Sequence, residues 1–223
     1  MSNINKHNTP HILIVAALAQ ESFPFIKMLH FTEQLDHNYV MGYWEELKIS
    51  VLTCGVGIKP AKTRTSALLK QHSFDCILNV GTCGALNDNY PIGSLCTVSS
   101  ITFEDEPSII IQEDSSCTLV TALEVVADAQ TRIQLATKAD ICDMEGYAIA
   151  QIVQDLTPKT PLYLFKVVSD LAGGEDDQAI NLGTRSERLA VFKARTKQLS
   201  SLRLLPHTQS WLLKYKEQFA ASL

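Results

Sequence analysis

The stretch HILIVAA, residues 11–17, constrains the fold of this chain more than any other segment. Its apolar residues follow one another without polar alternation, which is typical of a strand that is covered on both faces. The runs DCILNV at 75–80 and LYLFKVV at 162–168 predict two companion strands, and stretches with helical spacing lie between them at 61–71 and 146–156. This alternation predicts an α/β fold, in which helices flank a central mixed, largely parallel sheet in three layers.

The other segments fit the same single domain. Further strands are expected at 38–44, 47–54, 94–103, 108–112, 117–126 and 139–144, and further helices at 20–30 and 127–138. The segment GTCGALNDNYPIG, which follows residue 80, is expected to be a long turn-rich connection. Pro24 is compatible with its helix only within the first turn.

The N-terminus is expected to be flexible, whereas the C-terminal part of the chain is expected to be helical. Residues 1–10 are polar and predict a flexible N-terminus, whereas residues 11–223 are expected to form one domain. From about residue 186 the spacing predicts one or two amphipathic helices. Four apolar residues are expected on one face of these helices: Leu189, Phe192, Leu199 and Leu202.

The composition excludes several kinds of protein. The 223 residues carry a formal net charge of −5 and no basic stretch stands out, which argues against a nucleic-acid partner. No apolar run approaches the roughly 18 residues that a membrane span needs, and the opening residues lack the apolar core of a signal peptide. The six cysteines show no CxxC pair and no histidine at zinc spacing, so we expect reduced thiols, a cytoplasmic location, no metal and no cofactor.

Three carboxylates follow three of the expected strands. Glu21, Glu145 and Asp170 each come just past an apolar run, and ligands of α/β sheets bind beyond the carboxyl ends of the strands. Each acid alone has an ordinary explanation, as a first-turn helix acid or a turn residue. Thr82, on a turn between glycines, is either structural or offers its hydroxyl and N–H to an anion. The three acids together predict a ligand site.

The segments that carry these acids resemble a known superfamily. They read ILIVAALAQES, then CGVGIKPAKTRTSALLKQHSFDCILNVGTCGAL, then ICDMEGYAIAQIV and LYLFKVVSDLA. In order and spacing they are similar to the nucleoside phosphorylase and nucleosidase superfamily, and most of all to its methylthioadenosine/S-adenosylhomocysteine nucleosidases. The resemblance covers roughly residues 11–100 and 117–175.

The resemblance implies cleavage of the N-glycosidic bond of a purine nucleoside. Glu145 matches the glutamate that accepts hydrogen bonds from the ribose hydroxyls, and its charge favours the cationic sugar of the transition state. Asp170 matches the acid that shares a proton with the departing purine, and Glu21 matches the glutamate that activates water. The catalytic residues implied are thus Glu21 and Asp170. The implied substrate-binding residues are Glu145, Met144, Thr82, Cys83, Gly84 and Ser169.

Departures from the family pattern bear on the nucleophile. Asn79 stands where the similar phosphorylases carry an arginine, and Pro60 stands in the glycine loop where they continue into a serine. Both changes weaken a phosphate cradle, so water is the expected nucleophile. Lys59, Lys62 and Arg64 leave phosphate open as a co-substrate.

Other departures bear on the substrate. The stretch VTALEVVADAQ has aliphatic residues where the nucleosidases carry an aromatic that stacks on adenine, and AGGEDDQAI after SDLA also lacks an aromatic. The short segment before ICDMEG resembles futalosine hydrolases and hopanoid-associated phosphorylases. These enzymes, a phosphate-dependent purine nucleoside phosphorylase and a non-catalytic nucleoside binder are the alternatives. By resemblance, the protein is expected to be a homodimer that acts on a small-molecule nucleoside.

Overall fold

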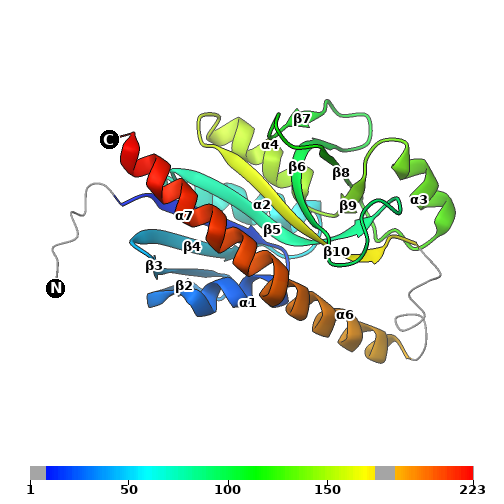
Figure 1. Cartoon of the computed structure of the whole chain (residues 1–223), viewed down its shortest axis with the longest axis horizontal. Helices are drawn as coiled ribbons and strands as arrows, with labels where there is room; N and C mark the ends of the chain where they lie inside the picture. Colours follow the sequence, from blue (N-terminus) through cyan, green and yellow to red (C-terminus); the bar gives the residue numbers. More distant parts are fainter. Residues whose placement is uncertain (1–8, 174–183, 223) are drawn as a thin grey trace.

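The computed structural model describes residues 9–173 and 184–222, and within them it shows one mixed α/β unit (Figure 1). The expectations for the first eight residues and for most of AGGEDDQAI therefore lie outside the described residues. In the described part of the chain no helix is both long and apolar enough to cross a membrane.

Ten strands of the described chain form one sheet with both parallel and antiparallel pairs. They are β1 (His11–Ala16), β2 (His30–Asp36), β3 (Tyr39–Trp44), β4 (Leu47–Thr53), β5 (Cys76–Ala85), β6 (Leu95–Thr102), β7 (Ile109–Ile110), β8 (Cys117–Thr121), β9 (Ile141–Asp143) and β10 (Leu162–Leu171). The helices are α1 (Ala19–Met28), α2 (Ile58–Leu69), α3 (Ala129–Ala136), α4 (Gly146–Leu156), α6 (Arg185–Leu199) and α7 (Leu205–Ala221), with a π-helical turn η1 (Ser200–Leu204) between the last two. The expected fold class is confirmed.

The sheet has an open half and a closed half. Its strand order is β10-β6-β8-β9-β5-β1-β4-β3-β2, and β10 also pairs with β5, so β5, β10, β6, β8 and β9 close into a ring. Strand β5 belongs to both halves, because one of its edges pairs with β10 along most of its length, while the other edge pairs first with β1 and then, near Ala85, with β9. The carboxyl ends of β1 and β5 therefore come together with the ends of β9 and β10.

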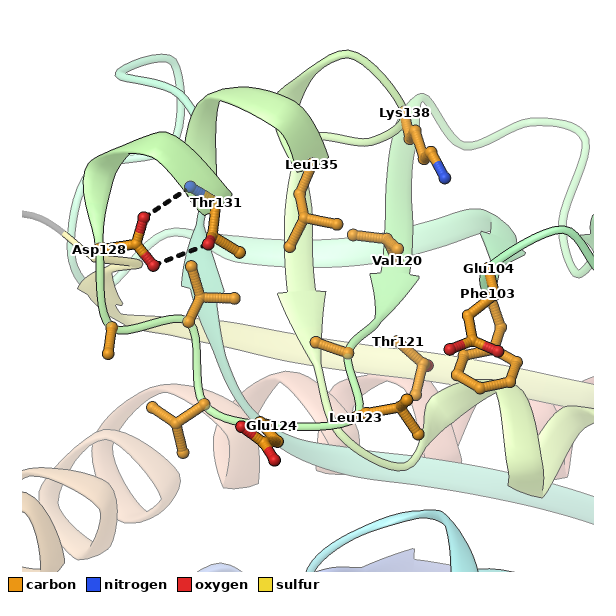
Figure 2. Close-up of a pocket in the computed structure, with 14 residues that line it drawn as sticks. Phe103, Glu104, Val120, Thr121, Leu123, Glu124, Asp128, Thr131, Leu135 and Lys138 are labelled. Carbon is orange, nitrogen blue, oxygen red and sulfur yellow. Dashed lines mark hydrogen bonds between the residues drawn. The ribbon is translucent and has the colours of Figure 1, made fainter.

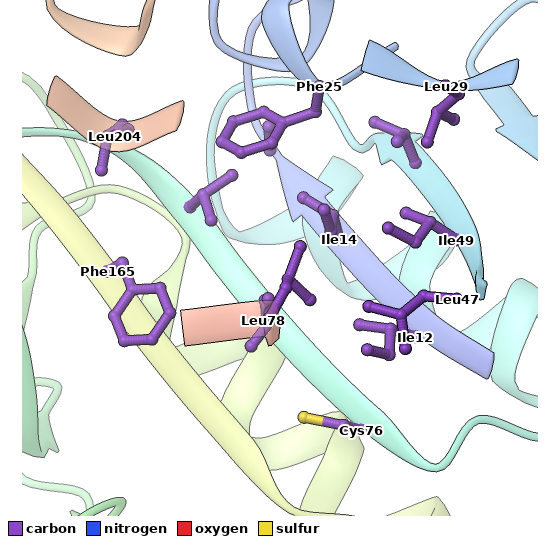
Figure 3. Close-up of a cluster of buried hydrophobic side chains, with 14 of the residues drawn as sticks. Ile12, Ile14, Phe25, Leu29, Leu47, Ile49, Cys76, Leu78, Phe165 and Leu204 are labelled. Carbon is purple, nitrogen blue, oxygen red and sulfur yellow. The ribbon is translucent and has the colours of Figure 1, made fainter. Parts of the chain in front are cut away.

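The position of β1 inside the sheet explains why its sequence is apolar without alternation. It lies between β4 and β5, and all of its residues after His11 are fully buried. Ile12 and Ile14 belong to a core cluster with residues of α1, η1 and α7, in which Leu78 and Phe165 also take part (Figure 3). The alternate residues, Leu13 and Val15, pack on the opposite face with residues of α2 and α4. Each such side chain contributes about 2 kcal/mol by leaving water.

Two strands are longer than the sequence predicts. The expected turn-rich segment after residue 80 begins as a strand, since β5 continues through GTCGA to Ala85 and places Thr82 within it. Strand β10 continues to Leu171, so Asp170 lies inside a strand and does not follow one. In both cases pairing continues past the expected end, because β5 and β10 remain in register from Leu162 to Leu171 with one irregularity after Val168.

Other expectations need correction at the edges of the fold. Strand β2 was not expected; all of its residues are exposed, so its sequence lacks an apolar alternation that would reveal it. Pro24 is the sixth residue of α1 and so lies past the first turn. Leu189 and Leu202 are exposed, whereas Leu204 and Leu212 are fully buried. Leu202 lies within the π-helical turn, where the regular α-helical spacing assumed from the sequence does not hold.

Candidate active site

All eight residues expected at the site line a single cleft of about 300 Å³. They are Glu21, Thr82, Cys83, Gly84, Met144, Glu145, Ser169 and Asp170. They come from α1, β5, the β9–α4 junction and β10, which are far apart in the sequence. The fold brings them together because β1 and β10 run parallel to β5, while the antiparallel β9 ends beside the last residues of β5.

Glu21 is held by three hydrogen bonds at the start of α1. The N–H of Thr82 donates to its Oε1 at 2.7 Å, and the Thr82 hydroxyl donates to the same oxygen at 2.9 Å. The N–H of Leu18 donates to Oε2 at 3.0 Å. The side chain is only 3% exposed, yet it lines the cleft. These contacts fix the carboxylate and occupy both lone pairs of Oε1, which leaves a lone pair of Oε2 for a ligand.

Glu145 stands directly before α4 and receives a hydrogen bond from the other side of the cleft. The N–H of Gly57 donates to its Oε1 at 2.6 Å. Gly57 has φ of 92°, a conformation that favours glycine and that aims its N–H at the carboxylate. Burial and the neighbouring Asp143 carboxylate raise the pKa of Glu145 to about 7, although the Gly57 N–H and Lys166 act to lower it. The carboxyl group of Glu145, the residue expected to bind the sugar, is therefore partly protonated near neutral pH.

Asp170 lies on β10 immediately after the irregularity of the strand pairing. The Ser169 hydroxyl contacts its Oδ2 at 2.6 Å, and that hydroxyl also lies 3.2 Å from the carbonyl oxygen of Cys83. Arg195 of α6 donates from Nη1 to the Ser169 carbonyl oxygen at 3.0 Å. A bulge of this kind re-aims side chains, and here it places two consecutive residues on the cleft.

Gly84 leaves room for Asp170. A Cβ atom at Gly84 would lie 2.9 Å from the Cβ of Ala172 and 3.2 Å from Oδ1 of Asp170. Real Cβ contacts are almost never that short at backbone-anchored atoms, so a side chain here would displace the acid. Gly84 therefore permits close packing within strand β5 and does not form a turn.

The other wall of the cleft is aliphatic. Ala122, Val125 and Val126, which follow β8, line it, and Val125 is 74% exposed. From the C-terminal helices, Leu189 and Phe192 reach the cleft. Phe192, expected only as a packing residue, is thus the one phenylalanine among the described lining residues.

A second hollow, of about 520 Å³, lies on the far side of this aliphatic wall (Figure 2). It is lined by residues of β8 and α3 and by Phe103 and Glu104, and it shares Ala122, Glu124, Val125 and Val126 with the cleft. Asp128 caps α3 there by accepting from the N–H and the hydroxyl of Thr131. Although larger, this hollow contains none of the three predicted acids, so the smaller cleft is the candidate site.

The cleft offers little to a phosphate dianion or a metal. Its described lining residues include no lysine and no arginine. Asn79 is buried and donates from Nδ2 to the Val15 carbonyl oxygen at 3.1 Å, while Lys59, Lys62 and Arg64 are exposed on α2. Within residues 9–173 and 184–222, no group of three or more His, Cys, Asp or Glu residues is arranged to hold a metal ion.

Sequence reasoning missed one buried pair behind the site. The ammonium of Lys166 lies 2.8 Å from Oδ2 of Asp143, and both side chains are 2% exposed. Burial lowers the pKa of Lys166, but Asp143 and, after it, Glu145 and Glu21 raise it, and the net shift is upward. Lysine within the apolar run LYLFKVV was the available signal, because a lysine is rarely buried without a partner.

Comparisons with known proteins agree with the geometry. The sequence profile of the phosphorylase superfamily matches residues 11–114. The 5'-methylthioadenosine nucleosidase of Arabidopsis thaliana is 25% identical over 209 residues, which cover 75% of this chain and 77% of that protein.

Two solved structures share the fold. A methylthioadenosine/S-adenosylhomocysteine nucleosidase from Colwellia psychrerythraea, in complex with adenine, has a TM-score of 0.71 at 18% identity and covers 86% of this chain and 93% of its own. The futalosine hydrolase of Helicobacter pylori has a TM-score of 0.72 at 16% identity and covers 97% of this chain and 100% of its own. The resemblance is confirmed: the chain has the fold of the nucleoside phosphorylases and nucleosidases, and its N-terminal part carries the sequence pattern of the phosphorylase superfamily.

Proposed function

We propose that the protein is an enzyme that cleaves the N-glycosidic bond of a purine nucleoside with water, as methylthioadenosine/S-adenosylhomocysteine nucleosidases do. The observation that carries this proposal is the convergence of Glu21, Glu145 and Asp170 in one cleft from three separate elements. The chain's similarity to a plant 5'-methylthioadenosine nucleosidase supports it. A nucleoside binder needs a carboxylate for the ribose but has no use for all three acids.

Glu145 holds the ribose and stabilises the transition state. Its Oε1 accepts from the Gly57 N–H, which leaves Oε2 to accept hydrogen bonds from sugar hydroxyls. As the glycosidic bond breaks, the sugar becomes an oxocarbenium-like cation, and a buried carboxylate stabilises that charge more strongly than it stabilises the neutral substrate. Met144, half-buried beside it on the cleft, packs against the ribose.

Asp170 and Glu21 act on opposite partners of the breaking bond. Asp170, held through the Ser169 hydroxyl, shares a proton with a ring nitrogen of the purine, so that the base departs as a neutral molecule. Glu21, held by Thr82, takes a proton from the attacking water. The water oxygen bonds to the anomeric carbon while the carbon–nitrogen bond breaks, and the products are free base and free sugar.

Water is preferred over phosphate for a reason of charge. The described cleft residues include several carboxylates and no lysine or arginine, so a phosphate dianion meets their repulsion and no lining side chain that would pair with it. Asn79 does not help to bind phosphate, because it does not line the cleft and its Nδ2 donates to the Val15 carbonyl oxygen. Phosphorolysis is therefore the alternative and not the main proposal.

The remaining expectations complete the proposal. All six cysteines are buried free thiols, which agrees with a reducing, cytoplasmic environment. A homodimer, expected from the family resemblance, and one domain over residues 11–223 remain part of the proposal. No nucleic acid or membrane partner is proposed.

The test is base release from purified protein, followed by chromatography. The panel is methylthioadenosine, S-adenosylhomocysteine, adenosine, inosine and futalosine, each with and without inorganic phosphate. We expect free base and free sugar in phosphate-free buffer for at least one substrate, and loss of release in the Glu21→Gln variant. Strict dependence on phosphate with a sugar 1-phosphate as product establishes the phosphorylase instead. Release from no substrate contradicts the proposed activity.

A further inference from the structure

The ion pair between Lys166 and Asp143 crosses the floor of the cleft. Lys166 is on β10 and Asp143 ends β9, and both of these strands pair with β5. Gly81 of β5 is the register partner of Lys166 and carries no side chain. A Cβ atom at Gly81 would lie 3.1 Å from Oε1 of Glu21, so the space above this glycine is filled by that carboxyl group. The ammonium therefore lies under the carboxylates of the cleft.

Asp143 ties this pair to the start of α4. Its Oδ1 accepts from the Thr121 hydroxyl at 2.8 Å and from the N–H of Glu145 at 3.3 Å. The N–H of Gly146 donates to both of its oxygens, at 3.1 and 3.0 Å. A carboxylate that binds these two N–H groups fixes the backbone of Glu145. Its negative charge is also stabilised by the positive end of the α4 helix dipole.

The charge of this arrangement is not balanced without the lysine. Among the described residues, four titratable groups surround Glu145. They are Asp143 in its own segment, Lys166 of β10, Glu21 of α1 and the Cys54 thiol just after β4. Three buried carboxylates thus lie around a single described ammonium. Since like charges in a buried site disfavour one another's ionisation, Lys166 is the group that permits them to coexist.

We propose that the Lys166–Asp143 pair is a positioning element that fixes both the place and the charge of Glu145. Asp143 binds the backbone N–H groups at the β9–α4 junction, and the ammonium of Lys166 compensates the negative charge of the Asp143 carboxylate. Neither side chain is assigned to the substrate. The effect on turnover rests on the proposed function, whereas the effect on Glu145 itself does not.

The direct test is a ¹³C NMR titration of glutamate carboxyl groups in the full-length protein, with the Glu145 signal assigned by its loss in Glu145→Gln. In Lys166→Met we expect the pKa of Glu145 to rise by about one unit, because the variant loses the one positive charge that lowers this pKa in the described part of the chain. Asp143 keeps its hydrogen bonds with the Thr121 hydroxyl and with the N–H groups of Glu145 and Gly146, so the β9–α4 junction is expected to stay in place. Lys166→Arg, which keeps the charge, is expected to restore the wild-type titration.

A second variant covers the case in which Lys166→Met does not fold. The double variant Lys166→Met with Asp143→Asn removes both charges of the ion pair together, so neither partner is left charged without the other, and the new amide oxygen still accepts from the α4 N–H groups. Because Asp143 affects Glu145 more than Lys166 does, the pKa of Glu145 is expected to fall below its wild-type value in this variant. The matched control is Lys62→Met, which removes an exposed lysine of α2 that contacts Gln151. No change is expected in the control.

Kinetics separate positioning from simple structural support. With a cleavable nucleoside, Lys166→Met is expected to raise KM and to lower kcat/KM about tenfold near pH 6, with the loss shrinking as pH rises. An unchanged Glu145 titration in Lys166→Met, or a fall in the single variant like that in the double, overturns the inference. If the wild type releases no base, the proposed function fails, and the NMR titration still decides on the positioning element.

Discussion

Replacing Glu145 by glutamine is expected to make the protein more stable at alkaline pH. Burial and the Asp143 carboxylate disfavour the ionised form of Glu145, so the folded protein holds its proton up to a pKa of about 7. The unfolded chain releases this proton near 4.5, the ordinary value. Between these two values the folded state binds more protons than the unfolded state, and its stability falls as pH rises.

The size of the effect follows from the difference between the two pKa values. A difference of about 2.5 units at about 1.4 kcal/mol per unit corresponds to about 3 kcal/mol. The contribution of neutral Glu145 is fully present below pH 4.5 and is lost as pH rises through about 7. Glutamine never ionises, and its amide oxygen can still accept from the Gly57 N–H. The variant is therefore expected to match the wild type at pH 4.5 and to exceed it by about 3 kcal/mol at pH 8.5.

Urea unfolding at the two pH values measures this difference. The transition can be followed by the fluorescence of the two tryptophans. In thermal scans the same difference corresponds to roughly 6 to 12 °C in Tm at pH 8.5. The control is Glu124→Gln, since Glu124 lies on the cleft wall but is exposed; its effect is expected to stay within about 0.5 kcal/mol. A Glu145→Gln variant that is less stable at pH 8.5, or equally changed at both pH values, refutes the reasoning.

Further predictions concern turnover and packing. In the wild type, kcat/KM is expected to rise with pH and to level above about pH 7, because Glu145 must lose its proton to act; a profile that is flat from pH 5.5 to 8 contradicts this role. Asp170→Asn is expected to lower kcat by about 10²- to 10⁴-fold with much less effect on nucleoside affinity, as steady-state kinetics and equilibrium binding can show. Gly84→Ala is expected to cost about 1–3 kcal/mol in urea unfolding and to lower kcat, because the new methyl group meets Ala172 and Asp170; a fully active, equally stable variant contradicts the packing argument.

The gathering of two of the acids could be predicted from the sequence because it depends on a general property of α/β sheets. Glu21 and Asp170 lie near the carboxyl ends of β1 and β10, which both run parallel to β5, and such ends meet at one edge of a sheet. Strand β9 is antiparallel to β5, so Glu145 reaches the same cleft through that pairing and not through the general rule. Apolar runs such as HILIVAA mark the strands themselves, since a strand buried on both faces has little choice of residues. The helix α4 was expected over the same residues at which it is found.

What could not be predicted depends on contacts between distant segments. The glycines of GTCGA read as a turn, but on β5 they make room for Glu21 and Asp170, which are distant in sequence. The exposed strand β2 is formed by pairing with β3 and not by an apolar pattern of its own. The pairing of Lys166 with Asp143 joins two positions 23 residues apart; the apolar run around Lys166 indicates that it needs a partner, but no local rule identifies Asp143 as that partner.

The central claim is that water, and not phosphate, attacks the anomeric carbon of a purine nucleoside in this cleft. The most direct measurement is the mass of the sugar product after turnover in phosphate-free buffer made with H₂¹⁸O. The account predicts free sugar that carries one ¹⁸O atom from the attacking water at its anomeric hydroxyl, analysed promptly and corrected for exchange in free sugar added to the same buffer. It also predicts no such product with Glu21→Gln. No turnover until phosphate is added, with sugar 1-phosphate as the product, would contradict it.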